Sequence, residues 1–545
     1  MKNKRSSLVI VVFILICNSL FTIAQEHVQF DLETWRHKMN REEYAKIFTG
    51  DTDDAIKNML AYRKEHPDVA EDLYGLSVAY FSEDDFNKGE IFFEKAIGEG
   101  IPIERFMAGP RKILKPLYQS KIFKELLKNR ELIHGPMTGA VTKNSAKVWV
   151  RTLNESSFKV KVANTPELTN IIGIFSGQTT ESADYTGFAE ISGLKPNTQY
   201  FYSVEINGNS SAKVASFKTF PEKEDSTILR IAFGGGAFYN PKREYIWNVI
   251  AEQKPYFFLG MGDNVYIDHP DLPDVQKFCY YQRESSEPFR AMLKTVPYYS
   301  VWDDHDFGVN DSYGGAEKFK PAWKTKVLNV YKENTVNPYY GGGDENPGIW
   351  YDFSMGDIDF FMIDTRYYRT PSFVENNGAN ANMLGKVQMQ WLKKELKKST
   401  ATFKVIVSSI PWSDGAKDVM EGRFDTWRGY PKERAEIFDF LSDNKIEGVV
   451  LLSADRHRHD AWKHKRPGDY SLYEFTSSRL TNIHYHELRK DALFGYNENC
   501  GFGIIEFNTA AKQPYLVFKI ININNELIDQ IRIYLHQLQT PVTKD

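Results

Sequence analysis

Apolar residues between about residues 26 and 130 recur at steps of three and four positions, with few glycine or proline breaks. This spacing places the apolar side chains on one face of an α-helix. After residue 133 apolar and polar residues alternate, as they do in half-buried β-strands. After residue 223 short and largely apolar runs are each followed by a polar loop. The pattern alone predicts three regions of different architecture.

Two stretches of the helical region repeat each other. The repeated positions are Ala55, Met59, Tyr62 and Pro67 in the first copy and Gly89, Phe93, Ala96 and Ile101 in the second. Their common offset and their order of small and aromatic residues resemble tetratricopeptide repeats. Residues 25–132 are therefore expected to form a TPR-like helical region. Two roles remain open for it: a docking platform for a protein partner, or a cap that packs on its own neighbours.

The second region, residues 133–222, is predicted to be an antiparallel β-sandwich. Alternation is clear from Ala146 to Arg151 and from Phe158 to Val162. The stretch from Leu194 to Tyr202 resembles the turn and strand of fibronectin type III-like domains, in which a tyrosine holds a corner. The region carries no cluster of reactive residues, so we expect it to be a spacer or a lid.

The third region, residues 223–545, is predicted to be an α/β layered domain. Its apolar runs read as buried strands, and helical patterns lie between several of them. The expected strands are Leu229–Phe233, Phe257–Leu259, Phe360–Ile363, Val405–Val407 and Val449–Leu452. Polar residues follow each strand, and α/β folds place their sites at such strand ends. We expect any catalysis to occur here.

Length and composition agree with a globular protein of several domains. The 545 residues exceed what one hydrophobic core usually supports. Hydrophobic residues make up 42% of the chain and charged residues 26%, as in ordinary globular proteins. The net charge is only −4 and basic residues form no tract, so no nucleic-acid-binding surface is expected.

The N-terminus has the order of a secretory signal. A basic start precedes an apolar run from about Leu8 to Ile23, and the small residue Ala24 follows. We expect a signal peptide over residues 1–24 and export to the periplasm or the extracellular space. A retained membrane anchor is the alternative. Two cysteines would remain, Cys279 and Cys500; a disulfide and two separate thiols are both open.

Three strand-end loops carry side chains suited to cations. The first contains Asp263, whose two oxygens can each take one metal, and Tyr266, which can face the same ion. The second places three carboxylates around one imidazole at residues 303–306, an arrangement that is hard to bury without a cation. The third contains Asp455 and His457, which would point to the same side of an extended segment. His459 continues that alternation and is interpreted as a surface histidine.

In order along the chain, these loops resemble the PhoD-like alkaline phosphatase family of the calcineurin-like metallophosphatases. The motifs are Gly-Asp-Asn-Val-Tyr at 262–266, Trp-Asp-Asp-His-Asp at 302–306, Asp-Thr-Arg at 364–366, Leu-Gly at 384–385 and Ser-Ala-Asp-Arg-His at 453–457. The β-sandwich is similar to that family's N-terminal domain, so the resemblance covers about residue 135 to the C-terminus. The helical region lies outside it.

The resemblance implies a role for each matching residue. Asp263 would bridge two metal ions, Tyr266 would bind a ferric ion, and Asp304 would bind the second ion. Asp455 and His457 correspond to the last ligand pair. His305 would contact the phosphate and protonate the leaving oxygen, and Arg366 would hold phosphate oxygens with its planar fork.

One departure from the family pattern concerns the metal. The family typically has Phe-Gly-Ser-Cys at the end of the first strand, with the cysteine on iron, whereas this chain reads Phe233-Gly234-Gly235-Gly236. Gly236 offers no side-chain ligand, which favours harder ions or an open coordination position. Alternatively, the glycine amides approach phosphate closely. Two metal ions are expected, with iron and calcium implied by the resemblance and zinc, manganese or magnesium as alternatives.

The sequence thus predicts a phosphoric ester hydrolase that uses a dinuclear metal site and acts on a phosphate-ester substrate. A phosphodiesterase with a strict diester preference would use the same residues. A binding or scaffold protein with a degenerate metal site is the alternative from another class, motivated by Gly236 and the helical repeats.

Overall fold

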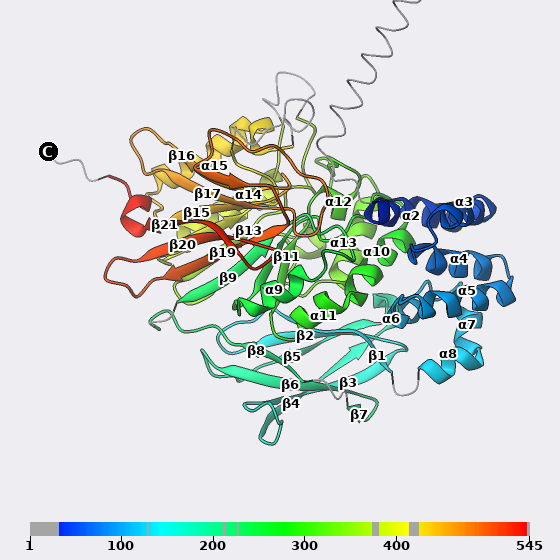
Figure 1. Ribbon diagram of the computed structural model, residues 1–545. Coiled ribbons are helices and arrows are strands. Elements are labelled where there is room, and N and C mark those ends of the chain that lie inside the picture. Colours follow the sequence, from blue (N-terminus) through cyan, green and yellow to red (C-terminus); the bar gives the residue numbers. More distant parts are fainter. Residues whose placement is uncertain are drawn as a thin grey trace, which may run out of the picture.

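The computed structural model describes residues 32–127, 130–210, 214–225, 228–372, 381–413 and 425–541. Three regions follow one another along the chain: a column of helices, a pair of small sheets, and a larger part in which two sheets are flanked by helices (Figure 1). The expected signal peptide lies outside the described residues. Within them, no helix is both long and apolar enough to cross a bilayer.

The first region consists of short helices stacked side by side, at the right of Figure 1. They are α2 (Leu32–Thr49), α3 (Thr52–Glu65), α4 (Glu71–Ser82), α5 (Phe86–Gly98), α6 (Ile103–Ala108), α7 (Lys115–Gln119) and α8 (Lys121–Leu126). The prediction of helix is confirmed here, whereas the likeness to TPR repeats stays a prediction. The helices pack on α10 (Pro273–Ser285) of the third region: Tyr44 stacks on Phe278 at 3.9 Å, and Gln282 Nε2 donates to Glu71 at 3.1 Å.

The second region contains two antiparallel sheets. One has the order β1-β2-β5, and the other has β4-β3-β6-β7 with β8 also paired to β6. The strands are β1 (Leu132–Gly139), β2 (Ala146–Thr152), β3 (Ser156–Ala163), β4 (Ile171–Thr179), β5 (Thr186–Ile191), β6 (Gln199–Ile206), β7 (Asn209–Ser210) and β8 (Ala215–Lys218). The hydroxyl of Tyr200 accepts a hydrogen bond from the Lys195 amide at 2.8 Å and so holds a corner. The fibronectin assignment itself stays a prediction.

The third region is built on two mixed sheets. The six-stranded sheet has the order β11-β10-β9-β19-β20-β21, and the seven-stranded sheet has β12-β13-β14-β15-β17-β16-β18. The first contains β9 (Leu229–Gly234), β10 (Phe258–Met261), β11 (Tyr298–Val301), β19 (Gly501–Asn508), β20 (Tyr515–Asn522) and β21 (Leu527–Tyr534). The second contains β12 (Tyr351–Ser354), β13 (Ile358–Met362), β14 (Phe403–Val407), β15 (Val449–Ser453), β16 (His459–His464), β17 (Leu472–Ser477) and β18 (Phe494–Tyr496).

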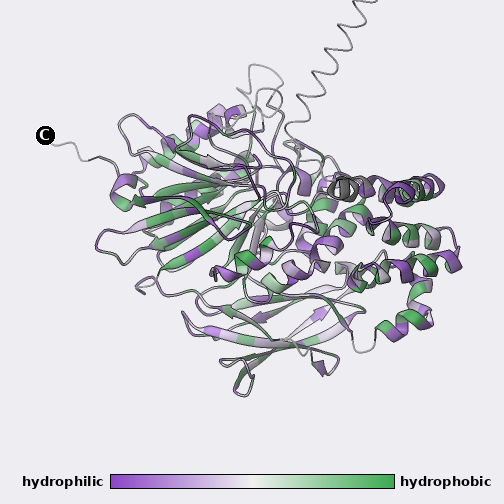
Figure 2. Ribbon diagram, in the orientation of Figure 1, coloured by the Kyte–Doolittle hydropathy of each residue, from purple (hydrophilic) through white to green (hydrophobic). Residues whose placement is uncertain are grey.

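The two mixed sheets pack face to face through aromatic side chains. Phe403 of β14 lies 5.4 Å from Phe507 of β19, and Phe475 of β17 stacks on Phe518 of β20 at 4.5 Å, measured between ring centroids. Figure 2 shows the hydrophobic colour concentrated on these strands. The large apolar area removed from water at this interface makes it the main core of the third region.

Helices flank the sheets. They are α9 (Ile246–Glu252), α10, α11 (Glu287–Leu293), α12 (Asp304–Phe307), α13 (Trp323–Glu333), α14 (Gly385–Lys398) and α15 (Pro431–Asp443). Most of them make the crossovers between parallel strands, whereas α12 and α13 lie between β11 and β12 of different sheets. Strands β9, β10 and β11 are mutually parallel, as are β13, β14 and β15. The expected strands are confirmed to within two residues at most ends. Because the strands within each of these two sets are parallel, their carboxyl ends meet at one edge of each sheet.

Cys279 and Cys500, the cysteines in the described part of the chain, are separate buried thiols. Cys279 lies on α10, and Cys500 immediately precedes β19. This decides between the two alternatives left open by the sequence.

Candidate metal centre

The predicted ligands lie in loops at the carboxyl ends of strands from both sheets. Asp263 follows β10, Asp304 follows β11 and Asp455 follows β15. Three acidic groups form there, each with one ligand atom per residue within 4.8 Å of the others. Their members are Asp263, Asp304 and His305; Asp303, Asp304 and Asp455; and Asp304, Asp311 and Asp425. Asp304 belongs to all three groups, so it lies at the middle of the cluster.

Asp263 is a buried carboxylate that is only half satisfied. The Tyr266 hydroxyl donates to its Oδ2 at 2.8 Å, whereas Oδ1 has no hydrogen-bond partner among the described residues. Burial, and then the charge of Asp304, hold the pKa of Asp263 well above its usual range. A buried carboxylate oxygen without a partner destabilises the fold unless a cation or a proton satisfies it. The residue thus fits a cation site.

The hydroxyl of Tyr266 lies between Asp263 and Asn482. It accepts a hydrogen bond from Asn482 Nδ2 at 2.6 Å. Burial, followed by the charge of Asp263, keeps the pKa of Tyr266 well above its usual value. In this arrangement the side chain is a neutral phenol. It would bind a metal as a phenolate only if the positive charge of that metal lowered its pKa.

The loop after β11 supplies two carboxylates with different surroundings. Asp304 accepts from the backbone amides of His305 at 3.0 Å and Asp311 at 2.7 Å. Asp303 accepts from Ser409 Oγ at 2.8 Å through Oδ1, while its Oδ2 has no partner among the described residues. Burial raises the pKa of Asp303 to about 7, although Arg366 opposes the shift. Asp303 was not among the predicted ligands, yet it has the same unsatisfied character as Asp263.

The third loop turns sharply where the sequence argument assumed an extended segment. Asp455 and His457 both have positive backbone φ angles, 65° and 37°. The two side chains therefore join different groups: Asp455 lies with Asp303 and Asp304, whereas His457 Nε2 lies 3.8 Å from Asp263 Oδ2. Asp263 itself has a φ of 51°. Non-glycine residues in this region cost about 1–3 kcal/mol each, and such strain is concentrated at functional sites.

His459 is not a surface residue, contrary to the interpretation from the sequence. It is fully buried at the start of β16, with Nδ1 at 3.1 Å from Ser477 Oγ. Burial lowers its pKa to about 3. It lies in the seven-stranded sheet and not in the cluster.

His305 is held at its Nδ1 atom. Asp268 Oδ1 lies 2.6 Å from this nitrogen, and Asp268 also forms an ion pair with Arg41 of α2. Arg41 donates in addition to the carbonyl oxygen of Tyr266. Burial disfavours the charged ring, but Asp304 and Asp263 outweigh it and raise the pKa of His305 to about 10. The first helix of the described part of the chain, α2, thus reaches the cluster.

Arg366 is fully buried, and its donors are already paired. Nε donates to Asp303 at 2.6 Å, and the two terminal nitrogens donate to the oxygens of Asp425 at 2.9 and 3.1 Å. Its nearest approach to Asp304 is 3.8 Å. The predicted phosphate contact of Arg366 stays a prediction. What the structure shows is a guanidinium that holds Asp303 and Asp425 in place.

Comparison with known proteins bears on this arrangement directly. Residues 232–499 match the model of the PhoD-like phosphatases, and residues 119–221 match that of the PhoD-like phosphatase N-terminal domain. The chain belongs to the PhoD-like phosphatase family. The match includes every predicted site residue and the β-sandwich, whereas α2–α6 precede it.

Among relatives of this PhoD-like phosphatase, alkaline phosphatase D of Bacillus subtilis (strain 168) is 24% identical over 362 residues. The aligned part makes up 59% of this chain and 61% of that protein. A solved structure of PhoD has a TM-score of 0.63 at 18% identity, covering 75% of this chain and 91% of its own. A purple acid phosphatase from yellow lupin (Lupinus luteus) seeds has a TM-score of 0.54 at 13% identity, covering 76% and 78%. Both likenesses show the fold.

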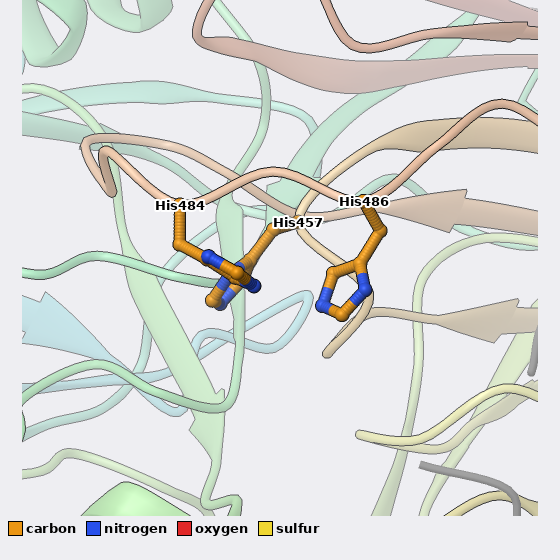
Figure 3. Close-up of side chains that lie close together, drawn as sticks. All are labelled: His457, His484 and His486. Carbon is orange, nitrogen blue, oxygen red and sulfur yellow. The ribbon is translucent and has the colours of Figure 1, made fainter. Parts of the chain in front are cut away.

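Two further histidines of this PhoD-like phosphatase lie beside His457. His484 and His486 come from the loop after β17, and one nitrogen of each ring lies within 4.8 Å of the others and of His457 (Figure 3). Burial, then His484 and His305, hold the pKa of His457 well below its usual value, and burial lowers that of His486 to about 4. Sequence reasoning missed both residues because they do not directly follow a strand. A His-x-His spacing was the available signal.

Proposed function

We propose that this PhoD-like phosphatase hydrolyses phosphate esters at a dinuclear metal centre built around Asp263 and Asp304. The observation that carries the proposal is the set of buried carboxylate oxygens, on Asp263 and Asp303, that have no partner among the described residues. Both residues belong to groups in which buried carboxylates converge, an arrangement that needs positive charge to be stable. Family membership supports the reaction class.

The chemistry of the side chains suggests how two ions would be divided between them. Asp263, Tyr266 and His457 offer mixed oxygen and nitrogen ligands, which suit iron or zinc. Asp303, Asp304 and Asp455 offer oxygen alone, which suits calcium, magnesium or manganese. Asp303 is thus added to the ligands expected from the sequence. The absence of a thiolate at Gly236 is consistent with this oxygen- and nitrogen-rich set.

In the proposed reaction, the oxygen of water forms a bond to phosphorus while the bond from phosphorus to the leaving oxygen breaks. Cations bound at the site would lower the pKa of that water and offset the negative charge that the phosphoryl group gains. The leaving oxygen receives a proton from His305 Nε2, since Nδ1 is occupied by Asp268. The proton that the attacking water gives up passes to solvent, and solvent returns a proton to His305 after the products leave. General acid catalysis of this kind contributes about 10²–10⁴-fold to the rate.

Arg366 and Asp268 are proposed as positioning residues. Arg366 fixes Asp303 through its Nε bond, and it can reach phosphate only by giving up part of its pairing with Asp425. Asp268 sets the orientation of the His305 ring. Well-positioned groups lower the barrier because the entropy of alignment is lost on folding, before the substrate binds.

Several wider expectations remain part of the proposal. The substrate is a phosphate ester, with monoester or diester preference to be measured, and the protein acts after export to the periplasm or the extracellular space. The domain limits proposed are 25–132, 133–222 and 223–545. The packing of α2 and α6 on α10 supports a cap role for the helical region, and a protein partner for its repeats is proposed as the alternative.

The variant Asp263→Asn tests the proposal. It removes one charge with little change of shape, so hydrolysis of a phosphate monoester and of a diester should fall at least about 1,000-fold, or about 4 kcal/mol in transition-state stabilisation. Steady-state kinetics with a panel of both ester classes gives the effect and the preference. Asp439→Asn, at an exposed position on α15, is the matched control and should keep normal rates. Near-normal turnover by Asp263→Asn would refute the assignment.

A further inference from the structure

Three imidazoles converge where the two mixed sheets meet the loop after β17. Their ring centroids lie 5.3 Å apart for His457 and His484, 5.7 Å for His457 and His486, and 4.9 Å for His484 and His486. The planes are inclined by 80°, 53° and 88°, respectively, so the rings are not stacked on one another. Figure 3 shows the side chains of His484 and His486 on the same side of their loop, toward His457. Inclined rings with converging nitrogens are the usual arrangement around a shared ion.

The loop that carries the two histidines is fixed at several points. The His484 amide donates to Asn482 Oδ1 at 2.9 Å, and Asn497 Nδ2 donates to the His486 carbonyl oxygen at 2.8 Å. Asn482 is itself bonded to Tyr266, as described above. The positions of His484 and His486 relative to His457 are therefore set by hydrogen bonds at both ends of the segment, which reduces the entropy lost when a ligand binds.

The loop is also pressed against the end of β9. The amides of Thr481 and Asn482 both donate to the Gly236 carbonyl oxygen at 3.2 Å. A Cβ atom at Gly236 would lie 2.9 Å from the Arg479 amide nitrogen and 3.3 Å from His457 Cδ2. The absence of a side chain at Gly236 thus allows this loop to approach His457 closely.

An independent observation at His457 points to a ligand. Its Nδ1 atom is buried and has no hydrogen-bond partner among the described residues. A buried ring nitrogen without a partner is unfavourable, and a metal ion is one of the few groups that can satisfy it. His484 and His486 keep access to solvent, which provides a route for the ion and for a water as a further ligand.

We propose that His457, His484 and His486 form a metal site that selects a late first-row transition-metal ion, with Zn²⁺ as the reference ion. Three imidazoles and a water are the ligand set of catalytic zinc sites, and nitrogen ligands disfavour Ca²⁺ and Mg²⁺. Zinc–nitrogen bonds of about 2.0–2.1 Å need nitrogens roughly 3.4 Å apart. One nitrogen of each ring already lies within 4.8 Å of the others. Small rotations of the side chains would therefore bring the three nitrogens to the spacing that zinc needs. Binding here does not depend on the proposed hydrolysis, although His457 is shared with the phosphatase centre.

The test uses the full chain without a polyhistidine tag, stripped of metal by a chelator and then titrated with Zn²⁺ or Co²⁺. The variant is His484→Gln/His486→Gln, and the matched control is His66→Gln/His536→Gln, which removes two histidines remote from the cluster. Bound zinc is measured by elemental analysis against a competing chelator. Nitrogen coordination is measured from the visible absorption of bound Co²⁺.

The wild type and the control should each bind one Zn²⁺ more than the variant. Because loss of a single outer-sphere partner already weakens metal binding about 10–100-fold, loss of two ligands should weaken this site more than about 100-fold. The Co²⁺ spectrum of the wild type should also change in the variant. Equal zinc content and equal Co²⁺ spectra in all three proteins would overturn the proposal.

Two further comparisons keep the outcome decisive. If circular dichroism shows that the double variant does not fold, His484→Gln and His486→Gln are measured singly, and each should weaken Zn²⁺ binding at least about 10-fold. If no variant, nor the wild type, hydrolyses phosphate esters but the zinc difference persists, the proposed function fails and this site stands. If phosphate esters are hydrolysed but the wild type and the variant bind equal amounts of zinc, the proposed function stands and this metal site fails.

Discussion

Gly236 has a backbone conformation and a set of neighbours that exclude a side chain. Its φ of 68° lies in the left-handed region, and a Cβ atom would press on the Arg479 amide nitrogen. The cysteine that the family pattern would place here has no room as long as the segment from residue 479 to 482 keeps its position. The loss of the thiol and the approach of the histidine-bearing loop are parts of one local arrangement.

The usual cost of a non-glycine residue at such a φ is about 1–3 kcal/mol. We therefore expect Gly236→Cys to lower the free energy of unfolding by more than this cost, because its Cβ atom also presses on the Arg479 amide nitrogen. Urea unfolding followed by circular dichroism gives this value. Gly193→Cys is the matched control, since Gly193 also has a positive φ, 72°, but nothing within 4 Å of its Cβ position. Equal destabilisation of the two variants would contradict this prediction. It would show that only the backbone strain at positive φ lowers stability and that the segment from residue 479 to 482 moves aside at no measurable cost.

At the same scale, the sequence predicted those of the proposed ligands that follow directly after a strand. Asp263, Asp304 and Asp455 could be found because apolar runs locate the strand ends from local pattern alone. Asp425 and His484 could not, since neither follows a predicted strand and each meets the cluster only through tertiary packing. Arg366 was found, but its paired state could not be, because that depends on Asp425.

Between elements, a buried charge network joins the β-sandwich to α10. Arg151 of β2 donates to Glu284 of α10 and pairs with Asp184 at 3.0 Å, while His134 of β1 lies 3.0 Å from Glu284. Burial raises the pKa of Glu284 from 4.5 to about 7, against the opposing charge of Arg151. The network fixes the sandwich on the larger region, and its charge state depends on pH.

This shift predicts a pH dependence of stability. A carboxyl group whose pKa is raised by folding stabilises the fold fully below its unfolded pKa, and that stabilisation is lost as pH rises through its folded pKa. The stability of Glu284→Gln relative to the wild type should therefore rise by up to about 3 kcal/mol between pH 4.5 and 7. Urea unfolding across this window measures the difference. Glu190→Gln, at an exposed site on β5, is the control, and its stability relative to the wild type should not change with pH. A pH-independent stability difference between Glu284→Gln and the wild type would contradict the prediction.

The elements themselves were largely predictable, whereas their pairing was not. The alternation in β2 and β3 and the apolar runs of β9, β13, β14 and β15 appear in the sequence at nearly their observed limits. The antiparallel pairing of β9 with β19 joins strands more than 260 residues apart, and no local pattern encodes it. The same holds for the packing of α2 on α10, which places Arg41 at the site.

At the scale of the whole molecule, the N-terminal helices contribute a residue to the centre of the third region. Arg41 of α2 pairs with Asp268, which holds the ring of His305. The helical region is therefore coupled to the proposed proton donor through one ion pair. In the proposed mechanism, this ion pair would give the helical region a role in the reaction whether or not the region also binds a partner.

We expect Arg41→Gln to lower kcat about 10-fold with little change in KM, because Arg41 orients a catalytic group without touching the substrate. Steady-state kinetics on the most rapidly hydrolysed ester measures both constants. Lys46→Gln, on the same helix in an exposed ion pair with Asp54, is the control. A kcat for Arg41→Gln equal to that of the control would show that Asp268 holds His305 unaided.

The order of strands in the six-stranded sheet also affects how the protein is made. During translation, β9 and β10 emerge well before residues 501–508, which form the neighbouring strand β19 on the other side of β9. Until then the nascent chain exposes an unpaired strand edge, the kind of surface that recruits wrong partners. The sheet that presents Asp263 is completed only after residues 501–534, which form β19, β20 and β21, have been synthesised.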